Sequence, residues 1–389
     1  MIARLIATAA TAATLLTVTG SAAHAGPIGI TVLPRPSGQI PVGTTTLHLV
    51  DGNRPDPFHP DRSRELMVSV FYPAADVEHY LRAHYVSSQL VPALEQQIGV
   101  ELPGLLTNSY SDAPALAGGG YPVILYSPGA GVTRLLGTGL AEDLASRGYV
   151  VVTIDHTYET APAVEFPGGR LAQFESQPEG FAPALRQRYI DARLPDVGFV
   201  LDSLTVLAQG GNPDAEQRAL PAGLEHALDL AHVGMVGHSS GGYTAVEALH
   251  DDRRIGAAVD LDGQLGVDRD FGRAATAGVD RPVLVLTSQQ IEEVGDARPS
   301  LDAFFGVGTG WKRQLSLRDS AHYDFTDRPL LIPDAAHPVD RRNIGVIPAA
   351  RGANLVHGYV AALFDKFLRA RTDTLLDRAP TDPEIIVLR

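Results

Sequence analysis

The strongest chemical signal in the chain is a pentapeptide near its middle. Residues Gly237–Gly241 read Gly-His-Ser-Ser-Gly, which matches the pattern G-x-S-x-G. An apolar run, residues 232–236, precedes this motif, and residues 243–249, which favour a helix, follow it. Between a strand and a helix this pattern indicates a nucleophile elbow, a strained turn that holds a serine hydroxyl over the sheet. The spacing therefore predicts that Ser239 is a nucleophile of acyl transfer.

A serine nucleophile needs a histidine base, which in this kind of site follows the serine along the chain. His322 comes directly after the last predicted parallel strand, in a loop. His337 lies in a loop next to a proline, and His357 belongs to the predicted final helix. We predict His322 as the base, because a loop that follows a strand places its side chains at the same sheet edge as the serine.

The acid that orients the histidine has several candidates. Asp260 and Asp262 lie on the strand after the elbow, and the alternation of side chains puts them on one face. Asp262 lies at the strand end, just before a glycine turn, where a carboxylate can reach a histidine. The residues therefore favour Asp262 over Asp260. The next strand is the commoner location of the acid in this fold, and it leaves three competitors open: Glu292, Glu293 and Asp296.

Acyl transfer also needs hydrogen-bond donors for the oxyanion that forms on the substrate. The N–H of Ser240 follows the nucleophile and begins the next helix, whose N-terminus favours negative charge. The loop Ser127–Gly131, after the first parallel strand, reads Ser-Pro-Gly-Ala-Gly, and its glycines let the backbone approach a substrate. We predict that the N–H groups of Ala130 and Ser240 form the oxyanion hole. The alternative for this loop is an ordinary turn between strand and helix.

Short apolar segments alternate with helix-length segments from residue 122 onward. This alternation predicts an α/β fold, with a mostly parallel sheet and helices on both of its faces. The predicted strands cover residues 44–50, 65–72, 123–126, 150–154, 233–236, 257–261, 283–286 and 313–317. The predicted helices cover residues 136–147, 194–208, 243–249 and 355–368.

Two stretches interrupt this alternation. Residues 76–120 contain a short helical pattern and three successive glycines, and residues 157–190 have no clear periodicity and are predicted to be loop-like. Either stretch can cover the active site as a lid, or can pack on the surface as ordinary structure. We predict one α/β-hydrolase domain over residues 26–389, with residues 76–120 as a candidate cap insertion.

The first 25 residues have the features of a secretory signal peptide. Arg4 supplies a positive charge, residues 5–18 form an apolar stretch too short to span a bilayer, and Ala23-His24-Ala25 is a cleavage site. We predict a secreted protein, cleaved between Ala25 and Gly26, with no later segment for membrane insertion. The chain has no cysteine, which excludes a thiol nucleophile, and its net charge of −14 argues against nucleic-acid partners.

The sequence carries no motif for a metal or a cofactor. The helical pattern His-Glu-x-x-His does not occur, and four clustered aspartates lack the spacing of a calcium loop: Asp260, Asp262, Asp268 and Asp270. We therefore predict catalysis without a cofactor or a metal, and we expect no obligate protein partner.

Three segments around the candidate residues resemble bacterial esterases of the platelet-activating-factor acetylhydrolase type, from actinomycetes. They are Gly-His-Ser-Ser-Gly-Gly at 237–242, Asp-Leu-Asp-Gly at 260–263 and Ala-His-Tyr-Asp-Phe-Thr-Asp at 321–327. With further segments at 121–124, 143–149 and 196–202, the resemblance covers about residues 65 to 375. It implies an α/β-hydrolase fold and Asp262 as the acid. One departure is the oxyanion loop, where relatives often have His-Gly and this chain has Pro128-Gly129.

The resemblance and the candidate residues together predict a secreted carboxylic-ester hydrolase. Ser239, His322 and Asp262 would act through an acyl-enzyme. The expected substrates are short-acyl lipid esters, such as acetyl-glycerophospholipids, or other small esters. A broader triacylglycerol lipase or a polyesterase is the alternative among enzymes. A secreted binding protein on a catalytically decayed hydrolase scaffold is the non-enzyme alternative.

Overall fold

The computed structural model describes residues 32–102, 104–175, 183–267, 270–291, 297–332 and 343–389. Its strands are β1 (Val42–Pro55), β2 (Ser63–Pro73), β3 (Arg82–His84), β4 (Leu106–Ser111), β5 (Tyr121–Ser127), β6 (Val150–Asp155), β7 (Ala163–Phe166), β8 (Arg170–Gln173), β9 (Leu228–His238), β10 (Ile255–Leu261), β11 (Gly266–Val267), β12 (Asp270–Phe271), β13 (Val283–Ser288), β14 (Lys312–Leu317) and β15 (Ile385–Val387). Its α-helices are α1 (Val91–Ile98), α2 (Thr138–Ser146), α3 (Pro183–Ala208), α4 (Ser240–Asp251), α5 (Arg273–Ala277), α6 (Ala297–Gly306), α7 (Arg328–Leu331) and α8 (Ala349–Phe367).

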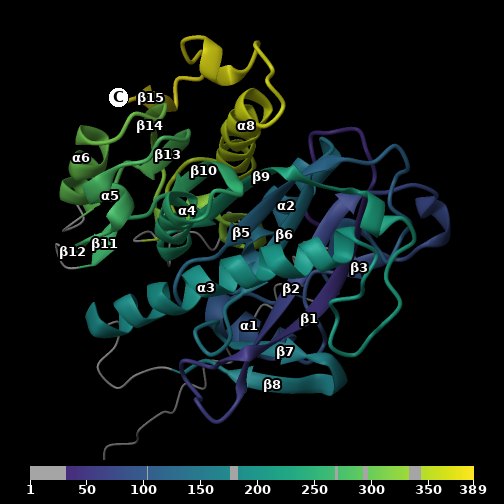
Figure 1. The fold of residues 1–389 in the computed structure, drawn as a ribbon. Helices are drawn as coiled ribbons and strands as arrows, with labels where there is room; N and C mark the ends of the chain where they lie inside the picture. Colours follow the sequence, from purple (N-terminus) through teal and green to yellow (C-terminus); the bar gives the residue numbers. More distant parts are fainter. Residues whose placement is uncertain (1–31, 103, 176–182, 268–269, 292–296, 333–342) are drawn as a thin grey trace, which may run out of the picture.

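An eleven-stranded sheet runs through the described part of the chain, in the order β15-β14-β13-β10-β9-β5-β6-β2-β1-β4-β3 (Figure 1). The neighbouring strands β14, β13, β10, β9, β5 and β6 are parallel. Between each of these strands and the next one along the chain, a helix returns the chain to the edge of the sheet at which the strands begin. β2 pairs antiparallel with both β1 and β6, and β15 pairs antiparallel with β14. This is the mostly parallel sheet that the sequence predicted.

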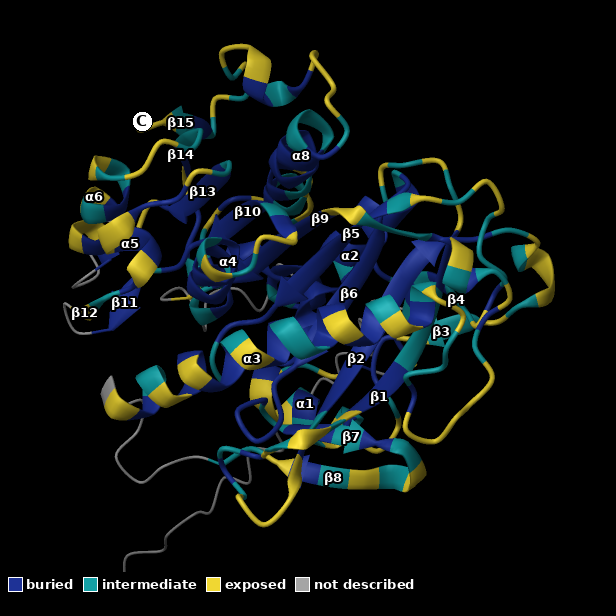
Figure 2. Ribbon diagram, viewed as in Figure 1, coloured by how far each residue is buried: buried dark blue, intermediate teal, exposed yellow. Residues whose placement is uncertain are grey.

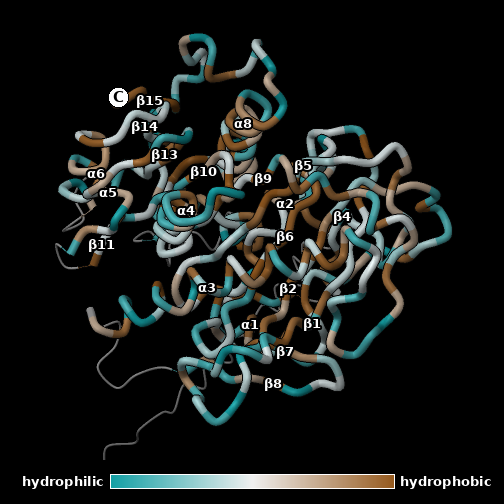
Figure 3. Tube along the Cα trace, viewed as in Figure 1, coloured by the Kyte–Doolittle hydropathy of each residue, from teal (hydrophilic) through white to brown (hydrophobic). Residues whose placement is uncertain are grey.

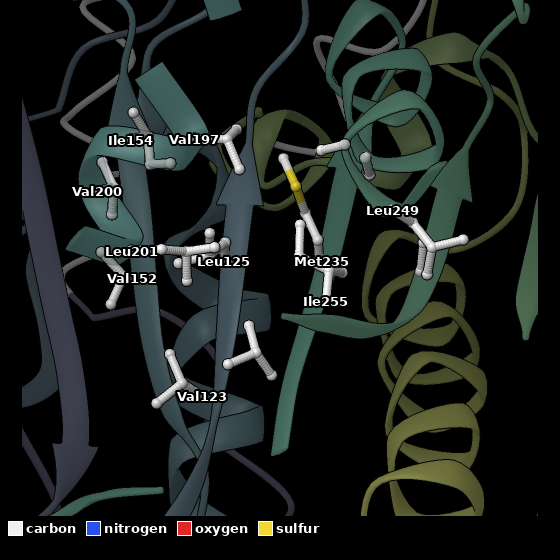
Figure 4. Packing of buried hydrophobic residues seen from close by; sticks show 14 of the residues in the cluster. Val123, Leu125, Val152, Ile154, Val197, Val200, Leu201, Met235, Leu249 and Ile255 are labelled. Carbon is white, nitrogen blue, oxygen red and sulfur yellow. The ribbon is translucent and has the colours of Figure 1, made fainter. Parts of the chain in front are cut away.

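Successive residues of the central strands belong to two different cores, as the alternation of side chains along a strand requires. Val123 and Leu125 of β5 pack beneath α3 and α4, whereas Ile124 and Tyr126 pack beneath α2 and α8. Figure 4 shows the first of these cores, where β5, β6 and β9 meet α3. Both faces of these strands are buried, so their sequences are continuous apolar runs (Figure 3).

Helix α3 buries one side against the sheet and leaves the other in solvent (Figure 2), whereas α2 and α4 are buried along almost their whole length. In α8 the buried positions follow the helical period: Leu355, Val356, Tyr359, Val360, Leu363 and Phe364. Burial of each such side chain contributes about 1.5–3 kcal/mol relative to exposure. The two helix layers and the sheet between them form the rigid scaffold that holds the loops at the strand ends.

All eight predicted strands and all four predicted helices are present, most of them a few residues longer than predicted. The loop prediction for residues 157–190 is wrong in part, because β7 pairs with β8 and α3 already begins at Pro183. The helical period of α3 is hidden in the sequence because two of its fully buried positions are charged, Arg193 and Asp196.

Residues 76–120, the candidate cap, form α1 and the edge strands β3 and β4. The helix α1 packs against the segment that follows β5, where Leu90 and Leu94 share a small core with Val132 and Leu136. In the part of the chain that the structure describes, no helix has the length and apolar character needed to cross a membrane. The predicted signal peptide lies outside the described residues.

Candidate active site

The predicted site residues follow the carboxyl ends of neighbouring parallel strands. Strand register places these ends level, with Ser127 opposite Gly237, His238 opposite Leu261, and Ser288 opposite Leu317. Ser239 comes directly after β9, Asp262 directly after β10, and His322 in the loop region after β14. The crevice outside the carboxyl ends of a parallel sheet is the usual position of a binding site in this class of fold.

Ser239 lies on a strained turn, as the motif predicted. Its φ of 57° and ψ of −122° lie outside the regions that non-glycine residues normally occupy. A Cβ on Gly237 would lie 2.1 Å from the carbonyl oxygen of Gly241, and one on Gly241 would lie 1.9 Å from the carbonyl oxygen of Ser127. Only glycine fits at these two positions, and the hydrogen bond from Ser239 N to Leu261 O, 2.8 Å, fixes the turn to β10.

Asp262 and His322 form a hydrogen-bonded pair. The distance from His322 Nδ1 to Asp262 Oδ2 is 2.7 Å, and Asp262 Oδ1 accepts a hydrogen bond of 2.5 Å from the N–H of Ser288. The carboxylate is 1 % exposed and the imidazole 37 %. Because a carboxylate can only accept, Nδ1 carries the proton of the neutral ring and Nε2 holds a free electron pair. This arrangement suits a base oriented by a buried acid.

Ser239, Asp262 and His322 line the same cavity, of about 410 Å³, together with Ala130 and Ser240. Much of the remaining wall is apolar and includes Ile190, Tyr243, Val267, Ile291 and Ala297. Among the described residues, no hydrogen bond joins Ser239 Oγ to His322. A hydrogen bond between nucleophile and base often tightens only when substrate binds, and the shared cavity places the two side chains around the same space.

Asp260, which lies within β10, makes no hydrogen bond to His322 among the described residues. Its Oδ1 accepts a hydrogen bond of 2.9 Å from Gly263 N, and burial raises the pKa of Asp260 to about 8. The predicted common face of the two aspartates is wrong, since β10 ends at Leu261 and Asp262 has a φ of 56°. The three competing acids, Glu292, Glu293 and Asp296, lie outside the described residues, as does Asp268.

The other predicted histidines are placed differently. His357 is on α8, where burial lowers its pKa and Asp143 of α2 is the nearby acid. His337 lies outside the described residues. Within the described ranges, no group of three or more His, Asp or Glu side chains is arranged to hold a metal ion.

The two predicted oxyanion donors, Ala130 and Ser240, line the same cavity as Ser239. Ser240 is the first residue of α4, and the first N–H groups of a helix have no acceptor within it. Ala130 follows Gly129, at which an added Cβ would lie 3.3 Å from Ser239 Cβ and 3.1 Å from His238 Nδ1. The loop after β5 is therefore in direct contact with the elbow. This arrangement can stabilise negative charge on an oxygen bound next to Ser239.

His238 is a site residue that the sequence reasoning did not single out. Its Nε2 donates a hydrogen bond of 2.9 Å to the main-chain oxygen of His322, and the two ring centroids are 4.5 Å apart. Burial holds the pKa of His238 well below its usual range, so the ring stays neutral. The sequence could have indicated this residue by its position in the pentapeptide, because the residue before the serine is the last residue of the strand that leads to the site.

A serine at an elbow and an acid-paired histidine, both at the carboxyl edge of a mostly parallel sheet, define an α/β-hydrolase. The sequence matches the family "Platelet-activating factor acetylhydrolase, isoform II" over residues 30–339, which is most of its length. The chain belongs to this family and is a carboxylic-ester hydrolase. The family predicted from the motifs is thus confirmed, while the actinomycete origin stays a prediction.

Individual proteins that are similar to the chain agree with this assignment. A probable 1-alkyl-2-acetylglycerophosphocholine esterase of Arthroderma benhamiae is 28% identical, over 92% of this chain and 94% of its own. A platelet-activating factor acetylhydrolase of Cavia porcellus is 22% identical, over 77% and 70%. Among solved structures, a ferulic acid esterase from Streptomyces cinnamoneus is 34% identical with a TM-score of 0.76, over 92% of this chain and 99% of its own.

Proposed function

We propose that the chain is a secreted serine esterase that hydrolyses short-acyl esters through an acyl-enzyme. The observation that carries this proposal is the shared cavity, into which the Ser239 elbow and the His322–Asp262 pair both open. In this mechanism Ser239 Oγ attacks the ester carbonyl while His322 Nε2 takes the hydroxyl proton. His322 then gives the proton to the leaving alcohol, and water cleaves the acyl-enzyme by the same route.

Asp262 has two roles in this proposal. It holds the tautomer with a proton on Nδ1, and its negative charge stabilises the imidazolium that forms during attack. The hydrogen bond from Ser288 N fixes the carboxylate at a second point, so both of its oxygens are oriented. The N–H groups of Ala130 and Ser240 would bind the oxyanion, in a site that the apolar wall partly shields from water.

For the substrate we propose short-acyl esters, either of glycerophospholipids or of small alcohols. The names of the relatives support an acetyl ester, and the largely apolar cavity suits a small acyl group. With a net charge of −14, electrostatic attraction to anionic lipid is not expected, so contact with lipid would be apolar. A ferulic acid ester is a second candidate, favoured by the structural neighbour and by Tyr243 in the cavity wall.

Two measurements test this proposal. A fluorophosphonate should label Ser239 covalently, as identified by peptide mass spectrometry, whereas a decayed scaffold would remain unlabelled. Specificity constants for p-nitrophenyl esters from acetyl to palmitoyl should fall once the acyl pocket is full, because each methylene in a pocket is worth about 1–3 kcal/mol. A maximum at long chains, sharpened by an emulsion interface, would support a lipase instead. Methyl ferulate in the same assay decides the second candidate.

Export is part of the same proposal. Cleavage after Ala25 would leave Gly26 as the first residue of the mature protein. N-terminal sequencing of protein from the culture medium measures this directly. Met1 retained on exported material would contradict the signal peptide.

A further inference from the structure

The loop that carries Ala130 is held from behind by a buried guanidinium. Arg193 of α3, 1 % exposed, donates from Nη1 to the main-chain oxygen of Pro128, 2.6 Å, and from Nη2 to that of Gly129, 3.2 Å. Its Nε donates to Glu159 Oε1, 2.6 Å. Glu159 itself accepts a hydrogen bond of 3.1 Å from Gly131 N through its main-chain oxygen. The loop is thus fixed at three residues by one buried ion pair.

The contact to Gly129 determines the direction of the next N–H. A peptide group is planar and trans, so the carbonyl of Gly129 and the N–H of Ala130 point in opposite directions. With the carbonyl held by Arg193, the Ala130 N–H points away from Arg193. Ala130 lines the Ser239 cavity, and among the described residues its N–H has no main-chain or side-chain acceptor. The N–H is therefore available to an oxygen bound in the cavity.

Within the loop itself, the Gly129 carbonyl accepts a hydrogen bond of 3.1 Å from Val132 N, so Arg193 is its second donor and its only side-chain donor among the described residues. Gly129 has no side chain and tolerates backbone conformations that other residues avoid. Glycine is favoured here, because an added Cβ would lie 3.1 Å from His238 Nδ1 and 3.3 Å from Ser239 Cβ. The same absence of a side chain lowers the resistance to a peptide flip, which would turn the donor away from the oxyanion. One main-chain hydrogen bond closes this glycine-containing turn, and the buried guanidinium adds a second point at which the peptide is held.

We propose that Arg193 is a positioning residue of the oxyanion hole, which holds the Gly129–Ala130 peptide so that the Ala130 N–H faces the oxygen of the reacting ester. The inference rests on the proposed serine mechanism and adds a residue to it. Arg193 contacts no substrate in this arrangement and acts only through the loop. Its effect therefore appears on the transition state, where the oxyanion exists, and much less on substrate binding.

The test compares two variants and one control. R193M/E159Q removes the guanidinium together with its partner charge, so that no unpaired carboxylate stays buried. R193K keeps the positive charge and part of the donor set. The control is R64M/D56N, since Arg64 is also fully buried and pairs with Asp56 at 2.9 Å and with Asp196 at 2.6 Å but does not contact the loop. In this control Asp196 keeps its hydrogen bonds to Arg54 and His156. Circular dichroism and thermal unfolding show which variants fold.

The substrates are p-nitrophenyl acetate and its thiono analogue, in which sulfur replaces the carbonyl oxygen. Sulfur is a poor hydrogen-bond acceptor, so the preference for the oxygen ester reports on the oxyanion donors. We expect R193M/E159Q to lose about 10–100-fold in kcat on the oxygen ester, with KM changed by no more than about twofold. The preference for the oxygen ester should shrink by a similar factor. R193K should fall between this variant and the wild type, and R64M/D56N should keep the wild-type preference.

An equal loss on both esters would overturn the proposal, because it would show that Arg193 acts only on stability. An unchanged kcat would overturn it as well. If R193M/E159Q does not fold, R193K decides by the same ratio, and a wild-type ratio in R193K counts against the proposal. Failure of the serine mechanism is recognised separately, since Ser239→Ala would then retain wild-type hydrolysis, and the inference would fall with it.

Discussion

Among the described residues, two sets of serine, histidine and aspartate are arranged in the same chemical order. In the first, Asp262 is hydrogen-bonded to His322, which shares a cavity with Ser239. In the second, Ser127 Oγ lies 2.9 Å from His156 Nε2, and His156 Nδ1 lies 2.9 Å from Asp196 Oδ2. By hydrogen-bond geometry alone, the second set is the more complete triad. Its position in the molecule shows that it cannot act as one.

The second set has neither access nor a usable base. Ser127, His156 and Asp196 are fully buried. Burial lowers the pKa of His156 to about 4, and the nearby Arg193 contributes to this shift, so the ring resists protonation during any attack by Ser127. A substrate would also have to displace α3. The second set is therefore structural, and it links β5, β6 and α3 behind the oxyanion loop.

The two acids, Asp196 and Asp262, also differ in the positive charges that surround them. Asp196 is buried, but Arg64 and His156 hold its pKa well below the usual range, and Arg54 adds a further bond of 2.6 Å. Asp262 has no arginine partner among the described residues and receives hydrogen bonds from Ser288 N and His322. The charge of Asp262 is thus available to a developing imidazolium, whereas that of Asp196 is already neutralised. Residue types in order do not make a catalytic triad without access, a strained elbow and oxyanion donors.

The largest contrast is expected between the two serines. Ser239→Ala should reduce kcat on p-nitrophenyl acetate by about 10⁴–10⁶-fold and leave the midpoint of thermal unfolding nearly unchanged, because only the nucleophile is lost. Ser127→Ala should retain kcat within about tenfold. If Ser127→Ala is as inactive as Ser239→Ala in a folded protein, the proposed division between the two sets is wrong.

The two acids should separate activity from stability. Asp262→Asn should lower kcat by about 10⁴-fold in a folded protein, since the amide stabilises the wrong tautomer of His322. Asp196→Asn should lower the free energy of unfolding by about 3 kcal/mol, because Arg64 loses its buried partner, with a much smaller change in kcat. Urea unfolding and steady-state kinetics measure both.

The acid assignment has its own control. Glu292→Gln and Asp296→Asn remove the competing acids that the sequence leaves open. Both should retain nearly the wild-type kcat. Near-normal activity of Asp262→Asn with a crippled Glu292→Gln or Asp296→Asn would place the acid after β13 instead.

A substitution in the loop after β5, which lies between the two sets, should have a smaller effect on kcat. Gly129→Ala adds a Cβ at 3.1 Å from His238 Nδ1 and 3.3 Å from Ser239 Cβ, so the elbow and the oxyanion loop must move apart by a few tenths of an ångström. We expect kcat to fall by about 10–100-fold, since small misplacements of donors are costly. Gly52→Ala is the control, because an added Cβ there meets no atom within 4 Å. Equal activities of the two variants would mean that the loop is not in functional contact with the elbow.

The smallest effect on activity is expected at the buried Asp260, whose titration changes the stability with pH. Its pKa is raised to about 8 in the folded state, against about 3.9 when unfolded, so the folded state holds the proton longer. Stability from this group is therefore complete below about pH 4 and is lost as the pH rises towards about 8, by up to about 1.4 kcal/mol per pH unit. Asp260→Asn should remove this loss of stability, which urea unfolding between about pH 5 and about pH 9 would show.

The pH dependence of stability that Asp196 contributes has the opposite sign, because its pKa is lowered in the folded state and the stability it contributes is lost as the pH falls. Parallel pH profiles of wild type and Asp260→Asn would contradict the assignment.

The sequence by itself determined the strands, most helices, the elbow at Ser239 and the family. Apolar runs and their spacing depend on neighbours in the chain, and the glycines at 237 and 241 reflect a turn that is local. The ends of the strands follow from the same local patterns. The sequence could therefore predict that Ser239, Asp262 and His322 lie at the carboxyl edge of the sheet.

Only the tertiary structure decided which of the polar residues belong together. The positive φ of Asp262 directs the aspartate that follows β10 to His322, whereas Asp260 within β10 stays buried with a raised pKa. Arg193 and Asp196 interrupt the apolar period of α3, so the sequence could not reveal that they are buried or that Arg193 reaches the oxyanion loop. Residues far apart in the chain pair through long-range packing, and no local pattern records which charge meets which partner.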